Sequence, residues 1–107
     1  MGKYLVSYRV NPVAPWPSDP EKLLQMYEQA WAAVDALIEK GLIEDMGAFL
    51  DANSGFAVAN ADSEVVFQNL NTLWPFWLAE VKEAVSWDKA KEIWRATVQA
   101  QIEAAKK

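Results

Sequence analysis

The sequence predicts a single α+β domain built from four strands and three helices. Apolar residues alternate with period two in four short segments and recur at helical spacing in three longer ones. The length of 107 residues matches one domain with enough buried surface to form its own core. We therefore expect one domain over residues 1–107, with a core unit over 3–85 and an added C-terminal helix over 86–107.

The first strand is expected over residues 3–10, where alternation places Tyr8 on one face and Arg9 on the other. Residues 11–20 contain four prolines, which fix φ and remove backbone donors. This segment predicts a semi-rigid, extended connection, and Trp16 lies within it between two of the prolines.

The first helix is expected to begin after Ser18 or Asp19, because either side chain can cap its N-terminus. With Ser18 as the cap, Glu21 completes a capping box. Apolar residues then recur at spacings of three and four as far as Ile38, and Gly41 follows at a position where glycine often ends a helix.

The second and third strands are expected over residues 42–51 and 55–59. Residues 52–55, with the sequence Ala-Asn-Ser-Gly, lie between them, and Asn and Gly tolerate positive φ. We therefore expect a hairpin with its positive-φ residues among these polar and glycine positions.

The last part of the chain predicts a helix, a strand and a further helix. Asp62 or Ser63 is expected to cap the second helix, and Pro75 should end it because the residue before a proline disfavours helical geometry. The fourth strand is expected over 78–85, and Asp88 is the expected cap of the third helix.

These elements give the order β-α-β-β-α-β-α, and the first six form the ferredoxin-like split βαβ pattern. In this pattern two helices cover one face of an antiparallel sheet, so the other face needs a separate cover. The third helix or a second subunit can supply it. Apolar residues on both strand faces favour a dimer that closes into an α/β barrel.

A stretch at the end of the second helix resembles muconolactone isomerases and their relatives in the dimeric α/β-barrel group. It reads Leu73-Trp74-Pro75-Phe76-Trp77-Leu78-Ala79-Glu80-Val81, and the similarity spans residues 3–85. The resemblance implies a homodimer or higher homo-oligomer, a pocket between sheet and helices, and isomerisation by proton transfer without a cofactor. The second strand here has neither the histidine nor the arginine that the family tends to place near its pocket.

Glu80 and Arg9 are the candidate catalytic residues. Glu80 occupies the glutamate position of the shared run, and desolvation beside Phe76 and Trp77 would raise its pKa and make it a base. The alternative is a solvated or ion-paired strand residue. Arg9 can bind a substrate carboxylate through two hydrogen bonds, or it can pair with a carboxylate across the sheet.

Aromatic residues supply the candidate ligand site. Trp74, Phe76 and Trp77 surround the helix-to-strand corner and can wall an apolar pocket or plug the end of the helix layer. Trp16 can act as a lid, contact a partner subunit or pack its own loop. Asp45 can line a polar part of the pocket or lie at a solvated sheet edge.

Composition excludes several classes of function. With 15 acidic and 10 scattered basic residues, the net charge of -5 argues against nucleic-acid binding. The chain has no cysteine and no histidine, which excludes thiolate metal sites and histidine-based catalysis, so we expect no metal and no cofactor. No apolar run approaches a membrane span and no leader pattern is present, so we expect a cytoplasmic protein without a membrane partner.

The sequence therefore favours a small dimeric protein that binds an apolar or aromatic molecule bearing a carboxylate, with isomerisation as the catalytic hypothesis. One alternative is a ligand-binding or assembly protein of the same fold without catalysis. A second alternative comes from Tyr8, Trp74 and two asparagines of the second helix, which loosely resemble the residues of cofactor-free monooxygenases.

Overall fold

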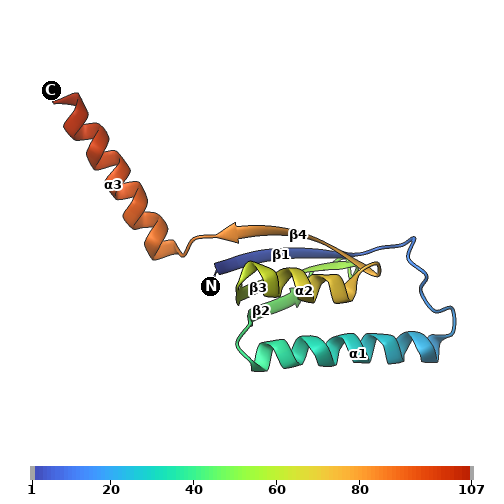
Figure 1. Cartoon of the computed structure of the whole chain (residues 1–107). Coiled ribbons are helices and arrows are strands. Elements are labelled where there is room, and N and C mark those ends of the chain that lie inside the picture. The colour runs from blue at the N-terminus through green and yellow to red at the C-terminus, as the bar shows by residue number, and fades with distance from the viewer. Residues whose placement is uncertain (1, 107) are drawn as a thin grey trace.

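The computed structural model describes residues 2–106, which form an antiparallel four-stranded sheet and three helices (Figure 1). The α+β class and the order of the seven elements are confirmed, and the topology is compatible with the ferredoxin-like arrangement. The elements are β1 (Gly2–Val10), α1 (Pro20–Glu39), β2 (Ile43–Ala48), β3 (Ser54–Ala61), α2 (Ser63–Leu73), β4 (Trp77–Ala84) and α3 (Trp87–Ala105).

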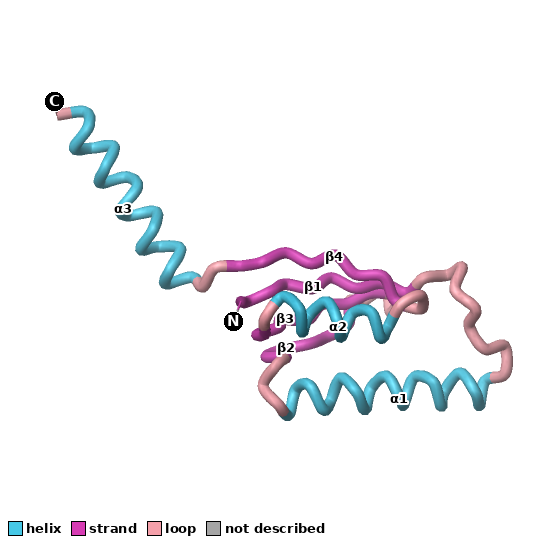
Figure 2. Tube along the Cα trace, in the orientation of Figure 1, coloured by secondary structure: helices cyan, strands magenta, loops and turns pink. Residues whose placement is uncertain are grey.

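The sheet has the strand order β2-β3-β1-β4, and Figure 2 shows the four strands side by side. Val6 of β1 pairs with Ala57 of β3 and with Val81 of β4. Side chains of directly paired residues lie on the same face, and successive residues alternate between faces. The register therefore defines a helix face, which contains Val6, and an open face, which contains its neighbours Leu5 and Ser7.

The buried core is small and lies where α2 meets the helix face. Among the described residues, the buried apolar side chains are Val6, Ala57, Ala59, Ala61 and Val66, and Leu70 of α2 packs against this group. The described part of α1 has no buried residue, so α1 does not pack closely along the sheet. An apolar space therefore remains between α1 and the sheet.

Helix α1 begins and ends as its sequence indicates, with one choice resolved. Asp19 is the N-cap, and its carboxylate accepts a hydrogen bond from the backbone N–H of Glu21 at 3.2 Å. Ser18 therefore does not form the capping box. Gly41 has φ 77°, the left-handed geometry that glycine adopts without strain just beyond a helix end.

The turn between β2 and β3 differs from the expectation. Strand β2 ends at Ala48, not at residue 51, and the positive φ of 65° falls on Ala52 instead of Asn53 or Gly55. The Asp51 carboxylate explains this, because it accepts hydrogen bonds from the backbone N–H groups of Asn53 and Ser54 and from the Ser54 hydroxyl. These bonds fix the turn around Asp51 and leave Ala52 to make the left-handed step.

Pro75 ends α2 as expected, but the cap of α3 differs from the prediction. Its cap is Ser86, whose hydroxyl accepts a hydrogen bond from the Lys89 backbone N–H, while Asp88 lies in the first turn. Helix α3 extends away from the rest of the chain and gives the molecule a length of 72 Å (Figure 1). It therefore does not cover the open face of its own sheet.

No helix in the described range is long and apolar enough to cross a membrane.

Candidate functional site

A groove of about 520 Å³ lies between α1, α2 and the helix face of the sheet. This volume falls within the range typical of small-molecule sites. The residues that line the groove are mainly apolar and come from both helices and from β1, β2, β3 and β4: Val6, Tyr8, Ala30, Trp31, Ala33, Val34, Ala36, Leu37, Lys40, Leu42, Ile43, Met46, Ala57, Ala59, Ala61, Val66, Asn69, Leu70, Thr72, Leu73 and Trp77.

Small side chains on β3 create the floor of this groove. Ala57, Ala59 and Ala61 alternate along the strand and are all buried on the helix face. Because an alanine side chain ends at Cβ, the three positions leave space that larger side chains would fill. The apolar stripe of α1 forms the opposite wall, and the helix is held off the floor.

The hydroxyl of Tyr8 is a polar group in the otherwise mainly apolar groove. Its hydroxyl donates a hydrogen bond to the carbonyl oxygen of Gly47 at 3.0 Å. Gly55 lies so close to the Tyr8 ring that a Cβ there would clash with the ring and with the Gly47 carbonyl. Burial raises the pKa of Tyr8 above its ordinary value of 10.0, so the hydroxyl stays protonated at neutral pH.

The remaining polar groups of the groove are one cation and two neutral side chains. Lys40 follows the last turn of α1, and Asn69 and Thr72 face the groove from α2. No carboxylate is present among the described residues that line the groove. The groove can therefore bind an apolar ligand, and Lys40 can attract an anionic group on that ligand.

The aromatic corner that the sequence indicated is assembled at one end of the groove. The Trp16 ring lies 5.0 Å from Phe76 and 5.3 Å from Trp77, measured between ring centroids, and both pairs have edge-to-face geometry. The indole N–H of Trp16 donates to the carbonyl of Asn11 at 2.6 Å, and the Asn11 amide donates to the carbonyl of Pro75 at 2.8 Å. These bonds hold the proline-rich loop against the corner.

Of the predicted aromatic ligand residues, Trp77 and Tyr8 line the groove and Trp16 and Phe76 pack behind Trp77. Trp74 is the C-cap of α2 and is exposed. The structure therefore brings four of the five predicted aromatic residues to the groove or to the corner that closes it.

Glu80, Arg9 and Asp45 lie on the open face, on the other side of the sheet from the groove. Glu80 pairs with Ser7, Arg9 pairs with Leu78, and Asp45 pairs with Val58, so all three alternate away from Val6. All three are exposed. The structure thus brings the two catalytic candidates to the same face and separates them from the aromatic ligand candidates.

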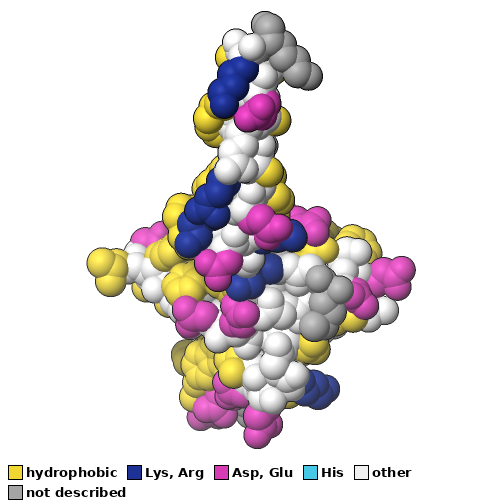
Figure 3. Space-filling view, turned by 90° about the vertical axis from the view of Figure 1, so that its left-hand side faces the viewer, with side chains coloured by type: hydrophobic (Ala, Val, Ile, Leu, Met, Phe, Trp, Pro, Cys, Tyr) yellow, Lys and Arg dark blue, Asp and Glu magenta, His cyan; other side chains and the backbone are white. Residues whose placement is uncertain are grey.

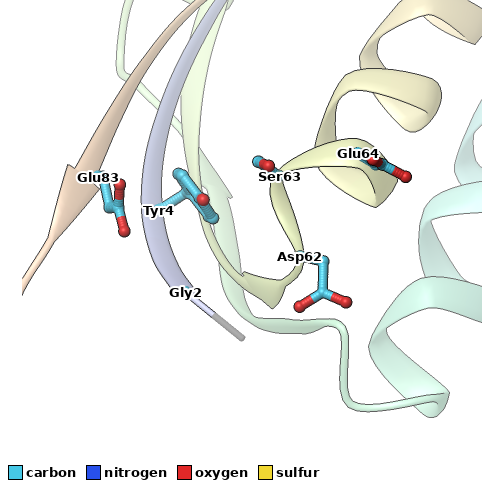
Figure 4. A pocket seen from close by; sticks show the side chains of 6 residues that line it. All are labelled: Gly2, Tyr4, Asp62, Ser63, Glu64 and Glu83. Atoms are coloured by element: carbon cyan, nitrogen blue, oxygen red, sulfur yellow. The ribbon is translucent and has the colours of Figure 1, made fainter.

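A second hollow, near the start of β1, is more open and polar. Gly2, Tyr4, Asp62, Ser63, Glu64 and Glu83 line it. Its three carboxylates do not converge on one point (Figure 4), and no group of His, Cys, Asp or Glu in the described range could hold a metal ion. We take the apolar groove as the candidate site because it is better enclosed and chemically more uniform.

Sequence reasoning missed Lys40 and the alanines of β3. Lys40 continues the stripe of Ala33 and Leu37 at spacings of four and three, so helical periodicity alone could have placed it on the groove wall. The alanines gave no comparable signal, because alanine is common in buried strands and helices alike.

Comparison with known proteins finds no matching family model and no matching curated protein.

Proposed function

We propose that this protein binds a small apolar or aromatic molecule in the groove between α1, α2 and the sheet. The supporting observation is the groove itself, which is apolar, walled by Trp31 and Trp77, and about 520 Å³ in volume. An apolar cavity of roughly 150 Å³ already binds benzene in a well-studied case, so this groove is large enough for a ligand of two fused rings.

Lys40 favours a ligand that carries a carboxylate. Its ammonium is the one cation among the described groove-lining residues, and the other polar groups there are neutral. A flat aromatic acid would place its ring over the alanine floor and its carboxylate toward Lys40. The Tyr8 hydroxyl already donates to the Gly47 carbonyl, so it can donate to the ligand carboxylate only if that bond is exchanged.

Binding without turnover is the function we favour, because the groove has no carboxylate base among its described residues. Isomerisation through Glu80 and Arg9 would instead require the substrate to lie on the open face. The monooxygenase-like alternative would use Tyr8 in the groove, but Trp74 lies outside it. The groove therefore favours the ligand-binding hypothesis over both enzymatic hypotheses.

We further propose that the protein forms a homodimer. The open face carries Leu5, which is 48% exposed, and the half-buried Phe56, Val58 and Leu78. Apolar side chains on an uncovered sheet face are normally covered by another layer, and α3 of the same chain does not provide it. A second copy can cover this face in the manner that the family resemblance implies.

Titration with 1-naphthoate and with its neutral methyl ester tests the binding proposal, with tryptophan fluorescence and NMR chemical shifts as readouts. Both compounds should bind and shift resonances of the groove. Lys40→Gln should weaken naphthoate about threefold to tenfold and leave the ester unchanged, since it removes one charged contact. Lys82→Gln, which removes a lysine from the open face, is the matched control. Absence of binding by both compounds would overturn the proposal.

A further inference from the structure

Helix α3 presents an apolar surface that its own chain does not cover. Its large apolar side chains are 49 to 68% exposed: Trp87, Ile93, Trp94, Val98 and Ile102. Trp87 and Trp94 are seven residues apart, which is two helical turns, and their rings meet edge to face at 5.8 Å between centroids. Exposed apolar surface of this extent on a projecting helix marks an interaction site.

Helix α1 presents a second exposed apolar row, with a seven-residue repeat. Leu24, Trp31 and Ile38 are separated by seven residues and are 43 to 53% exposed. A seven-residue repeat keeps side chains on one side of a helix, which is the arrangement that allows two helices to pair along their length. Of these three residues only Trp31 also borders the groove.

The charges beside these two rows have opposite signs. On α1, Glu21, Glu28 and Asp35 repeat every seven residues and lie three or four residues from the apolar row, which makes them its immediate neighbours. On α3, Lys91 lies four residues after Trp87 and three before Trp94, and its ammonium is 5.9 Å from the centre of the Trp87 ring. The acidic flank of α1 thus complements Lys91 of α3, which also pairs with Asp88 of its own helix.

The charge of the whole chain divides in the same way. Residues 86–107 contain five of the ten basic side chains and three of the fifteen acidic ones, so this segment is net positive and the remainder is strongly negative. Figure 3 shows Lys and Arg side chains alongside the hydrophobic side chains of the projecting helix. Helix α3 is therefore matched in charge to the rest of a second copy.

We propose that α3 of each copy packs along α1 of a second copy, so that two copies exchange their C-terminal helices. In one chain α1 lies beneath the sheet and α3 projects away from it, so the pairing is between chains (Figure 1). The helices have 20 and 19 residues, which gives nearly equal lengths of about 30 Å and 28 Å at 1.5 Å per residue. A two-fold axis makes both contacts equivalent.

The exchange deepens the proposed homodimer and rests on that self-association, but not on ligand binding. Burial of the exposed parts of Trp87 and Trp94 would remove on the order of 250 Å² per copy, at about 200 Å² for a whole tryptophan. A stable interface needs roughly 800 Å² on each partner. These two tryptophans therefore supply about a third of that area, and the rest must come from the other exposed residues of α1 and α3 and from the covering of the open face.

Sedimentation equilibrium on the full chain tests this arrangement. Trp94→Glu and Leu24→Glu should each raise the dimer dissociation constant at least tenfold, since each places a charge at a buried aromatic or aliphatic contact. Lys91→Glu should raise the dimer dissociation constant about threefold to tenfold. Combining Lys91→Glu with Glu28→Lys in one chain should restore part of the lost affinity. Because α3 makes few contacts with the rest of the described residues, circular dichroism should stay largely unchanged in the α3 variants.

Lys89→Glu is the matched control for Lys91→Glu. Each lysine makes one exposed ion pair at i,i+3 within α3, Lys89 with Glu92 and Lys91 with Asp88, and each substitution changes the charge equally. Lys89 lies two residues from Lys91, on the side of the helix away from the Trp87–Trp94 row. Lys89→Glu should leave the dimer dissociation constant within about twofold, because Lys89 lies away from the Trp87–Trp94 row and Lys91 lies beside it.

Cross-linking distinguishes this pairing from a contact between two α3 helices. The chain has no cysteine, so a mixture of Arg95→Cys and Glu28→Cys proteins can form disulfides only at these sites. Mixed disulfides support the exchange, whereas disulfides confined to Arg95→Cys pairs would overturn it. A dimer that Leu5→Glu dissociates but Trp94→Glu and Leu24→Glu leave intact would overturn the exchange and leave the homodimer standing. A monomer at all concentrations would overturn both.

Discussion

Replacement of Ala57 by leucine tests whether the groove is open space. Ala57 is 7% exposed, lines the floor of the groove and pairs with Val6 and Met46 in the sheet. Leucine adds three carbons, which gain up to about 2.4 kcal/mol at roughly 0.8 kcal/mol per buried methylene. Loss of leucine side-chain entropy subtracts about 0.5 to 1 kcal/mol, so we expect stabilisation of about 1 to 2 kcal/mol.

The opposite sign is expected for a closely packed core, where added methylenes cost about 1 to 3 kcal/mol. Guanidinium denaturation followed by circular dichroism measures the free energy of unfolding, and an unchanged m-value would show that the two-state comparison holds. The same variant should weaken 1-naphthoate at least tenfold, because the added side chain occupies the floor. Ala84→Leu, the same change on an exposed residue of the open face, is the control.

Two results would refute this reasoning. Destabilisation of Ala57→Leu by 1 kcal/mol or more, relative to the control, would mean that α1 packs on the sheet and leaves about 520 Å³ of groove unavailable. Stabilisation with unchanged naphthoate affinity would mean that the ligand binds elsewhere.

Four further predictions follow from individual contacts. Gly55→Ala should lower the free energy of unfolding by about 1 to 3 kcal/mol and displace Tyr8, measured by denaturation and by Tyr8 resonances, because the new Cβ meets the Tyr8 ring and a neighbouring carbonyl. Asn11→Ala should cost about 1 to 2 kcal/mol in denaturation and expose the aromatic corner to fluorescence quenchers, since it removes hydrogen bonds that the side chain makes to two loops. Hydrogen bonds to its carboxylate hold the pKa of Asp51 below its ordinary value of 3.8, so its stabilisation is present above that pH and is lost as the pH falls below it; Asp51→Ala should flatten this part of the stability profile. Glu80→Gln should leave 1-naphthoate affinity within about twofold, because Glu80 is on the opposite face of the sheet, and a tenfold loss in titration would place the ligand on the open face.

Periodicity and capping signals predicted most of the fold. The proline-rich segment, Gly41 and Pro75 are strong signals for the ends of helices and strands. The boundaries of the elements next to them were therefore predicted within a few residues. The turn after β2 was harder, because Asp51, not Asn53 or Gly55, organises its hydrogen bonds. A side chain that accepts several backbone N–H groups moves the positive φ to its neighbour, and residue preference alone does not show this.

The candidate site depended on information that alternation within one strand does not contain. Alternation separates Tyr8 from Arg9, but it does not say which face the helices cover. The pairing of Ser7 with Glu80 decides that Glu80 shares the face of Arg9, and this pairing exists only in the assembled sheet. The direction of α3 was equally inaccessible, because its amphipathic pattern indicates a buried face without identifying the partner.

The separation of the two sets of candidate residues restricts the mechanisms that the molecule can support. A base that removes a proton must come within hydrogen-bond reach of its substrate, and the sheet lies between Glu80 and the groove. One bound molecule cannot therefore contact both the aromatic corner and Glu80 of the same chain. Proton transfer by Glu80 requires a site formed where two open faces meet, whereas aromatic binding requires only the groove. Exchange of α3 links subunit association to the groove, because Trp31 of α1 lines the groove and also belongs to the row that α3 of the second copy would cover. Ligand occupancy and subunit association should consequently influence each other through Trp31, and by linkage each must change the other's affinity by the same factor.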